Sequence, residues 1–150
     1  MPAFKRILVP VDGSDTSKKA LAAALELARD SSGCVRLLHA VDELAYLTGF
    51  EYSNDVVKIA QQAAAKVLED ATAMAKTAGI PSDTELIEFP GQRLGETVAD
   101  AARKWNADLI VVGTHGRRGL GRVILGSGAE QIIRVAPIPV LTIRGEESKP

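Results

Sequence analysis

Short apolar runs alternate with segments of helical periodicity along this chain, and that alternation restricts the fold more than any other feature. The clearest run is Asp108 to Val112, which is continuously apolar after its first residue and is typical of a strand covered on both faces. Successive strands joined by helices require crossover connections, which are right-handed in nearly all proteins. The sequence therefore predicts a parallel sheet with helices packed on both faces.

The pattern predicts five strands and four main helices, bounded by turn residues. The second helix should carry an alanine-rich inner face that includes Ala60, Ala63 and Ala71. We expect a single doubly wound α/β domain over residues 1–150, with the Rossmann-like strand order 3-2-1-4-5 that adenine nucleotide alpha hydrolases also show. The expected strands are Phe4 to Val11, Val35 to Val41, Asp83 to Phe89, Asp108 to Val112 and Pro139 to Arg144; the helices begin in the polar cluster Asp12 to Ser17, at Asn54, near Leu94 and at Ser127.

Composition limits the classes of function. A chain of 150 residues with 46% hydrophobic content can bury one full core. Lys and Arg number 18 against 19 Asp and Glu, so no global charge attracts nucleic acid or an anionic membrane surface. The single cysteine, Cys34, cannot form an internal disulfide and is expected to be buried and inert. Neither a signal peptide nor a spanning apolar segment is evident, so we expect a soluble cytoplasmic protein.

A glycine-rich segment follows the buried strand at Val112. Six glycines fall between Gly113 and Gly128, where a simple turn needs one or two. Glycines let backbone N–H groups approach a ligand, and the free N–H groups that open the next helix attract negative charge. Arg117, Arg118 and Arg122 add positive charge, and we favour a phosphate contact by at least one of them over a merely solvated basic loop.

Asp12 stands just beyond the first strand and, in the expected topology, faces the glycine-rich segment across the switch point of the sheet. Its carboxylate could serve a ligand, by binding a ribose, a base or a metal held on phosphates, or it could bond its own backbone as a turn aspartate. Ala40 and Val41 end the second strand and could line an apolar slot for adenine, or simply pack in the core. Both alternatives stay open for each residue.

Histidines and missing motifs argue against rapid catalysis. His115 has no nearby Asp or Cys partner, and His39 is expected to be a core histidine bonded to a neighbour. Ser127 and Glu130 fit a capping box, so Ser127 can start its helix as well as bind an anion. The segment Asp42 to Asn54 could be a lid or an anchored loop. The chain has no P-loop, no Gly-x-Ser-x-Gly elbow and no zinc pair, so no catalytic residue is predicted.

In order along the chain, several segments resemble the ATP-binding branch of the universal stress protein family: Ile7 to Ser14, Leu38 to Asp42, Asp108 to Gly116, Gly126-Ser127 and Pro137 to Leu141. Gly113, Gly116, Gly126 and Ser127 match the family signature Gly-x2-Gly-x9-Gly-Ser/Thr. The resemblance implies that Asp12 contacts ribose, that Pro10, Val11 and Val41 surround adenine, and that the loop backbone holds the phosphates. Val112, Gly128 and Ala129 would complete the wall, although the family usually has a branched apolar residue at the position of Gly128 and some relatives carry a hydroxyl at that of Ala129.

The resemblance implies ATP as the ligand, and the sequence does not specify whether Mg²⁺ or Mn²⁺ accompanies it. It also implies a homodimer through the last strand, Val140 to Ile143. Physical reasoning agrees in part, because an apolar edge strand needs a cover. The candidate nucleotide-binding residues are Pro10, Val11, Asp12, Ala40, Val41, Val112, Gly113, Thr114, His115, Gly116, Arg117, Arg118, Gly126, Ser127, Gly128 and Ala129.

Three functions fit a chain of this kind to different degrees. The leading one is a nucleotide-dependent regulatory or protective module of the stress response. A slow ATP hydrolase or nucleotidyl-transfer enzyme on the same scaffold is the alternative, although the His-x-Gly-His and Ser-Gly-Gly-x-Asp-Ser signatures of such enzymes are absent. A phospho-receiver domain needs an aspartate at the end of the third strand, where this chain has Phe89-Pro90-Gly91.

Overall fold

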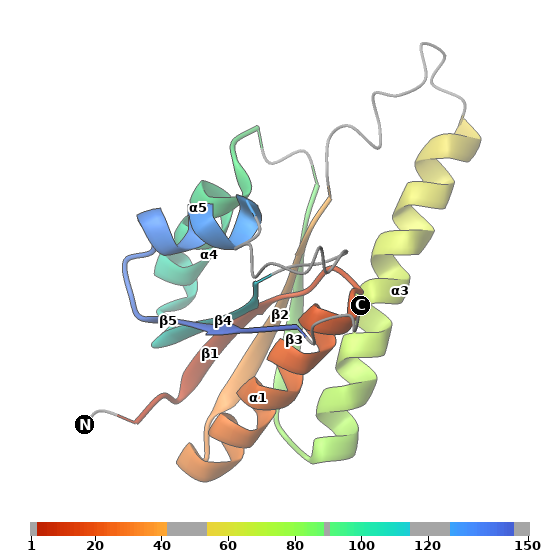
Figure 1. Cartoon of the computed structure of the whole chain (residues 1–150). Coiled ribbons are helices and arrows are strands. Elements are labelled where there is room, and N and C mark those ends of the chain that lie inside the picture. The colour runs from red at the N-terminus through yellow and green to blue at the C-terminus, as the bar shows by residue number, and fades with distance from the viewer. Residues whose placement is uncertain (1–2, 42–53, 89–90, 115–126, 146–150) are drawn as a thin grey trace, which may run out of the picture.

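The computed structural model describes residues 3–41, 54–88, 91–114 and 127–145, and in these ranges strands and helices alternate as expected (Figure 1). The five strands belong to a single sheet. The strands are β1 (Arg6–Pro10), β2 (Cys34–Ala40), β3 (Ser82–Ile87), β4 (Leu109–Gly113) and β5 (Val140–Ile143); the helices are α1 (Asp15–Ser31), α3 (Asn54–Ala78), α4 (Leu94–Trp105) and α5 (Ser127–Val135).

The strand order is β3-β2-β1-β4-β5, and every neighbouring pair is parallel, so the predicted fold is confirmed. In Figure 1, α1 and α3 cover one face of the sheet, and α4 and α5 cover the other. The order reverses between β1 and β4, whose carboxyl ends lie next to each other. That edge is where open α/β sheets bind ligands.

The alternation of side chains along each strand divides the core into two layers. Ile7 and Val9 of β1 pack with α1 and α3, whereas Leu8 between them packs with α4 and α5. In β4, Val111 joins the first layer and Ile110 the second, and both side chains are fully buried. Because both faces are covered, β4 is apolar at every position, and β1 is apolar at every position after Arg6, and not at alternate ones.

Strand ends and two single residues differ from the expectations. The observed strands begin or end one to two residues away from the predicted bounds, and Phe89, predicted to end the third strand, lies outside the described residues. Cys34 is half-buried, so the prediction of a buried thiol was wrong; it is the first residue of β2, at the end of the strand, where cover is incomplete. On α3, Ala64 is buried and Ala63 is exposed, one position away from the predicted inner face.

Over the ranges that the structure describes, no helix is both long and apolar enough to span a bilayer.

Candidate functional site

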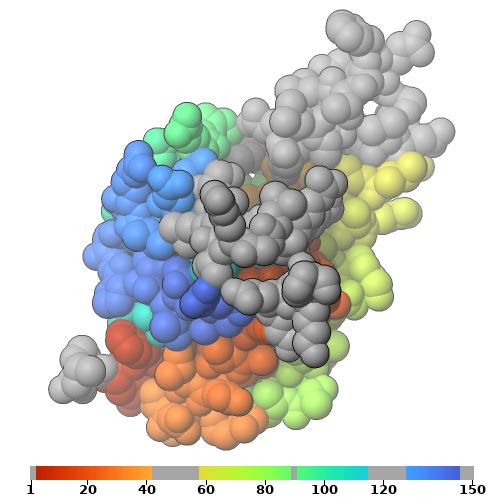
Figure 2. Space-filling model, viewed as in Figure 1, coloured from red at the N-terminus to blue at the C-terminus, as the bar shows by residue number. Residues whose placement is uncertain are grey.

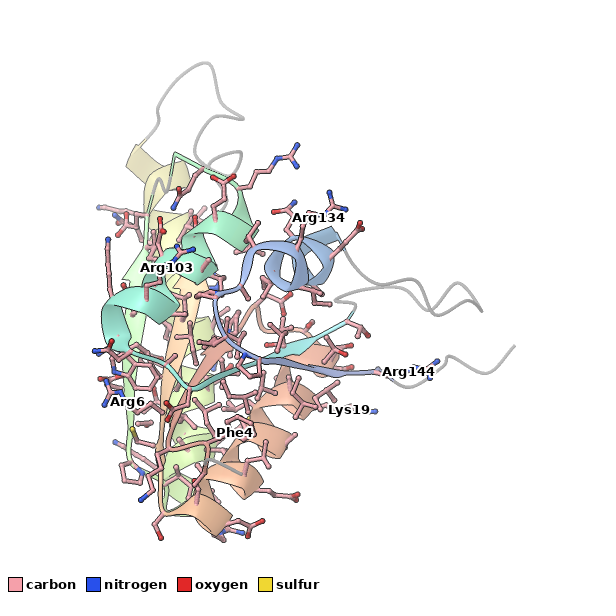
Figure 3. All side chains as sticks on the ribbon, turned by 90° about the vertical axis from the view of Figure 1, so that its left-hand side faces the viewer. Phe4, Arg6, Lys19, Arg103, Arg134 and Arg144 are labelled. Atoms are coloured by element: carbon pink, nitrogen blue, oxygen red, sulfur yellow. The ribbon has the colours of Figure 1, made fainter. Side chains whose placement is uncertain are left out.

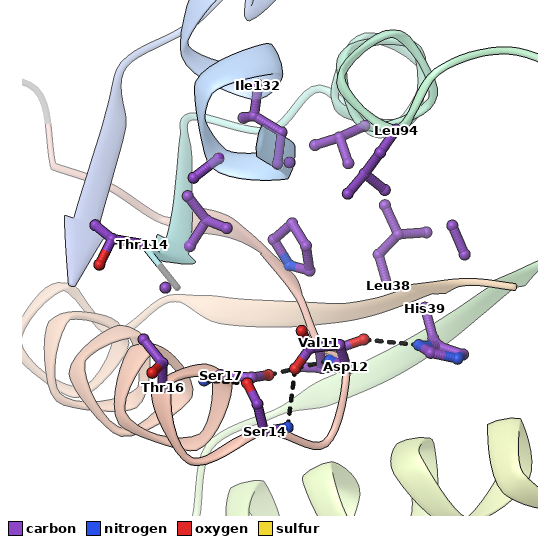
Figure 4. A pocket seen from close by; sticks show the side chains of 17 residues that line it. Val11, Asp12, Ser14, Thr16, Ser17, Leu38, His39, Leu94, Thr114 and Ile132 are labelled. Atoms are coloured by element: carbon purple, nitrogen blue, oxygen red, sulfur yellow. Dashed lines mark hydrogen bonds between the residues drawn. The ribbon is translucent and has the colours of Figure 1, made fainter. Parts of the chain in front are cut away.

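A cavity of about 170 Å³ opens at the carboxyl ends of β1, β2 and β4 and reaches the first turns of α1, α4 and α5 (Figure 4). It lies at the switch point of the sheet. Its lining residues come from five chain segments: Pro10, Val11, Asp12, Ser14, Thr16 and Ser17; Leu38, His39 and Ala40; Leu94 and Val98; Val112, Gly113 and Thr114; and Gly128, Ala129 and Ile132.

The cavity has one polar side and one apolar side. Asp12, Ser14 and Ser17 gather at the start of α1, whereas Leu94 and Ile132 lie across the cavity on α4 and α5 (Figure 4). Leu38, Val98, Val112 and Ala129 of the apolar side are buried in the core layer between the sheet and these two helices. A ligand with one flat apolar part and one polar part would match both sides.

The turn after β1 is fixed by its own side chains. The carboxylate Oδ1 of Asp12 accepts a hydrogen bond from the Ser14 N–H at 2.8 Å, and the Ser14 hydroxyl accepts one from the Ser17 N–H at 3.1 Å. The Ser17 hydroxyl in turn accepts one from the Asp12 N–H at 3.1 Å. Ser14 is the N-cap of α1, so its hydroxyl satisfies a backbone donor that the helix itself cannot pair. The turn is therefore held by local bonds that need no ligand.

This network resolves only half of the choice left open for Asp12. The turn role is observed, because Oδ1 is bonded within its own loop. The residue is nevertheless exposed at the cavity, and among the described residues no donor is bonded to its second carboxylate oxygen. Asp12 can thus serve the turn and still offer a carboxylate oxygen to a ligand.

His39 holds the backbone that lines the cavity floor. Its Nδ1 lies 2.7 Å from the Val11 carbonyl oxygen, and since a carbonyl only accepts, Nδ1 carries the hydrogen and donates it. This confirms that His39 is bonded to a neighbour, but the residue is half-buried and lines the cavity, so the prediction that it lies in the core was wrong. The Val11 N–H is bonded to the Leu38 carbonyl, so Val11 is tied to β2 from both of its backbone polar groups.

Gly113 lacks a side chain because α1 comes too close. A Cβ at Gly113 would lie 2.6 Å from Cγ2 of Thr16 and 2.9 Å from its carbonyl oxygen. The same threonine limits Gly145, where a Cβ would lie 2.7 Å from Oγ1. The first glycine of the signature is therefore required by packing of β4 against α1, whatever its role toward a ligand.

Nine of the candidate residues line the cavity together, and they come from four separate chain segments: Pro10, Val11, Asp12, Ala40, Val112, Gly113, Thr114, Gly128 and Ala129. Val41 does not line it and instead packs with Ala64 and Ala60 beneath α3. Ser127 is the first residue of α5. His115, Gly116, Arg117, Arg118 and Gly126 lie outside the described residues, as do Asp42 to Ser53 of the expected lid.

Sequence reasoning missed several lining residues. Ser14, Thr16 and Ser17 could have been found, because three hydroxyl residues follow Asp12 at the start of a helix next to the switch point. Leu94 and Ile132 gave no such signal, since their position depends on how α4 and α5 pack together. Within the described part of the chain, no group of three or more His, Cys, Asp or Glu side chains is arranged to hold a metal ion.

Comparison with known proteins adds three findings. Residues 3–144 match the model of the universal stress protein family. A universal stress protein of Methanocaldococcus jannaschii is 35% identical over 146 residues, which cover 94% of this chain and 82% of that protein. A solved structure from the same family in Burkholderia pseudomallei is 34% identical, has a TM-score of 0.76, and is matched over 95% of this chain and 98% of its own.

A further solved structure was determined with a nucleotide. The universal stress protein of Archaeoglobus fulgidus, in complex with dAMP, is 24% identical to this chain with a TM-score of 0.70. The match covers 95% of this chain and 99% of that one. At this level of identity the likeness concerns the fold.

Proposed function

Because the chain belongs to the universal stress protein family, we propose that it is a cytoplasmic ATP-binding module whose bound nucleotide sets which conformation or partner is favoured. The observation that carries the proposal is the cavity at the switch point. It joins the exposed Asp12 carboxylate to an apolar wall, beside Gly113, which opens the glycine-rich segment. An apolar slot with a few converging polar groups is the usual form of a small-molecule site.

The described residues fit an adenine nucleotide. The cavity volume, about 170 Å³, is below the roughly 300 Å³ at which pockets begin to enclose whole drug-sized ligands. A flat base would fill the apolar part, and the ribose and phosphates would extend outward past Asp12. The α5 N-terminus follows the glycine-rich segment, and free N–H groups at a helix start favour anions.

ATP in particular, in preference to another adenine nucleotide, is supported by the signature spacing from Gly113 to Ser127. The Archaeoglobus protein was solved in complex with dAMP, so in that relative the same fold accommodates an adenine nucleotide. The phosphate-binding roles of Gly116, Gly126 and the loop arginines rest on the sequence. Mg²⁺ or Mn²⁺ would accompany the phosphates.

The proposal includes a homodimer through β5. This strand forms one edge of the sheet, and Leu141 on it is 38% exposed. Figure 2 shows the segment that carries α5 and β5, in blue, at the molecular surface. Ile133 and Val135 of α5 are also exposed, so the same region carries further apolar surface.

The test of nucleotide binding uses Asp12→Asn. The amide oxygen can still accept from the Ser14 N–H, so the turn should be retained while the charge is lost. We expect the variant to bind ATP more weakly by about 1 to 3 kcal/mol, the value of a hydrogen bond to a charged group. Isothermal titration with ATP measures this, and the rise in melting temperature at about 1 mM ATP gives an independent reading.

Asp15→Asn is the matched control. Like Asp12→Asn, it removes one negative charge, here from the first turn of α1. Asp15 is exposed and does not line the cavity. Its affinity for ATP should equal that of the wild type. Absence of any ATP-induced stabilisation of the wild type, together with no adenine nucleotide in the natively purified protein, would refute the proposed function.

A further inference from the structure

Gly128 lies in the cavity wall where a side chain would be expected, and its backbone does not require glycine. It is the second residue of α5, and the glycines with positive φ are Gly13, Gly79 and Gly91 among the described residues. A side chain there would instead meet a neighbour. A Cβ at Gly128 would lie 2.9 Å from Cδ2 of Leu94, so the end of the Leu94 side chain would have to move aside to make room for it.

Leu94 therefore fills the space that a side chain at position 128 would need. It is the first residue of α4, it lines the cavity, and it is 39% exposed. Figure 4 shows Leu94 above Leu38, at the end of the cavity away from Thr114. An exposed leucine at the start of a helix can turn outward by a change of rotamer, so a larger residue at position 128 would displace Leu94 from this place.

The start of α4 is fixed to α5 beside this contact. The Gly95 N–H donates to the side-chain oxygen of Gln131 at 3.1 Å. A Cβ at Gly95 would lie 2.6 Å from the backbone carbon of Gln131, so the two helices touch backbone to backbone. Leu94 and Gly128 are thus held in register by their immediate neighbours.

We propose that Leu94 is the residue of the apolar wall that packs against the base and that Gly128 is present to admit it. Thr114 and Gly113 lie at the end of the cavity from which the glycine-rich segment follows in the sequence, and the phosphates would bind toward that end. Leu94 lies at the other end and contacts the base. The proposal rests on the nucleotide-binding function proposed above and names a residue that contacts the base in this chain.

A double-mutant cycle tests the pair, with the variants Leu94→Ala, Gly128→Val and both together. ATP and AMP are titrated against each variant by calorimetry. Leu94→Ala should lower the affinity for ATP and AMP by the same factor, roughly three- to tenfold, because truncation to alanine removes part of the apolar contact between the leucine side chain and the base. Gly128→Val should lower both affinities by displacing Leu94, and should cost little further, or restore affinity, when Leu94 is already alanine.

Leu86→Ala is the matched control, since Leu86 is also 39% exposed but lies on β3 and does not line the cavity. Gly128→Ala replaces Gly128→Val if the valine variant does not fold. Additive losses in the cycle, or a loss for ATP without a loss for AMP, would overturn the inference while leaving nucleotide binding intact. Failure of the wild type to bind either nucleotide would instead remove the proposed function and this inference with it.

Unfolding without ligand gives a second reading of the contact. Gly128→Val should destabilise the wild type more than it destabilises Leu94→Ala, because the clash partner is then absent. The cycle cancels the gain in helix propensity that any replacement of glycine brings, since that gain occurs in both backgrounds. Equal destabilisation in both backgrounds contradicts the contact.

Discussion

At the scale of single residues, Trp105 is held at the amino-terminal end of the sheet by two arginines. The guanidinium carbons of Arg6 and Arg36 lie 4.3 and 4.9 Å from its ring centroid. Arg6 also donates two hydrogen bonds to the Trp105 carbonyl oxygen. Figure 3 shows Arg6 at the opposite end of the sheet from Arg144, which follows β5. This cluster is therefore remote from the cavity and serves stability.

Arg36 makes the stability of this cluster depend on pH. Its Nε and Nη2 each donate to a carboxylate oxygen of Asp83 at 2.8 Å, and these hydrogen bonds, with the charge of Arg36, hold the pKa of Asp83 below its ordinary value. A carboxylate with a lowered pKa in the folded state stabilises above its unfolded pKa, about 3.9, and loses that contribution as pH falls through the lower folded value.

We therefore predict that Asp83→Asn lowers the melting temperature at pH 7 and that this difference shrinks as the pH falls below about 4. The difference should correspond to less than about 1 kcal/mol, because the Asp83 side chain is 53% exposed and solvent screens the pair. Melting curves of both proteins between about pH 7 and about pH 2.5 measure it. A difference that stays constant with pH would contradict the ion pair, and ATP affinity should be unchanged.

The sequence allowed a candidate-site residue to be predicted only where strand order alone determines its position. Asp12 follows β1 and Gly113 ends β4 at the switch point, so topology alone brought them together. Leu94 could not be found in this way, because its contact with Gly128 depends on the packing of α4 against α5. The sequence showed that Gly128 replaces the branched apolar residue usual in the family, but it did not show that Leu94 occupies the space.

At the scale of elements, the α4–α5 contact fixes the helix that follows the glycine-rich segment. We predict that Gly95→Ala destabilises the protein by about 1 to 3 kcal/mol, since its Cβ would meet the Gln131 backbone, which cannot turn aside. This should exceed the gain of up to about 1 kcal/mol that alanine brings to a helix. Urea unfolding measures the change, with Glu96→Ala, an exposed neighbour on the same turn, as the control.

If Gly95→Ala proved as stable as the wild type, the two helices could separate freely and the fixed position of Leu94 would be lost as an argument.

Strands and helices themselves were predicted to within two residues, because their apolar runs are long and bounded by turn residues. The inner face of α3 was less well defined. Alanines occur on more than one face of this helix, so they do not mark the inner face clearly. Ala63 was therefore predicted on the inner face where the structure has Ala64.

At the scale of the whole molecule, the two edges of the sheet carry matched apolar residues. Leu141 on β5 and Leu86 on β3 are 38% and 39% exposed. The two edges differ in their surroundings, because exposed Ile133 and Val135 of α5 accompany β5. An uncovered apolar edge strand favours association, and a two-fold pairing of β5 with its copy would cover both strands at once.

We predict that Leu141→Arg converts the protein to a monomer, because two arginines would meet across the two-fold axis and lose their hydration. Leu86→Arg introduces the same charge at the same exposure on the opposite edge and should leave the dimer intact. Sedimentation or light scattering distinguishes the 15.9 kDa chain from twice that mass. A wild type that is monomeric at tens of micromolar would refute the dimer, and a dimer broken by Leu86→Arg instead would place the association elsewhere. Pro137 and Pro139, which cannot donate backbone hydrogen bonds, confine the pairing to the four residues of β5, so a single charge there should suffice to disrupt it.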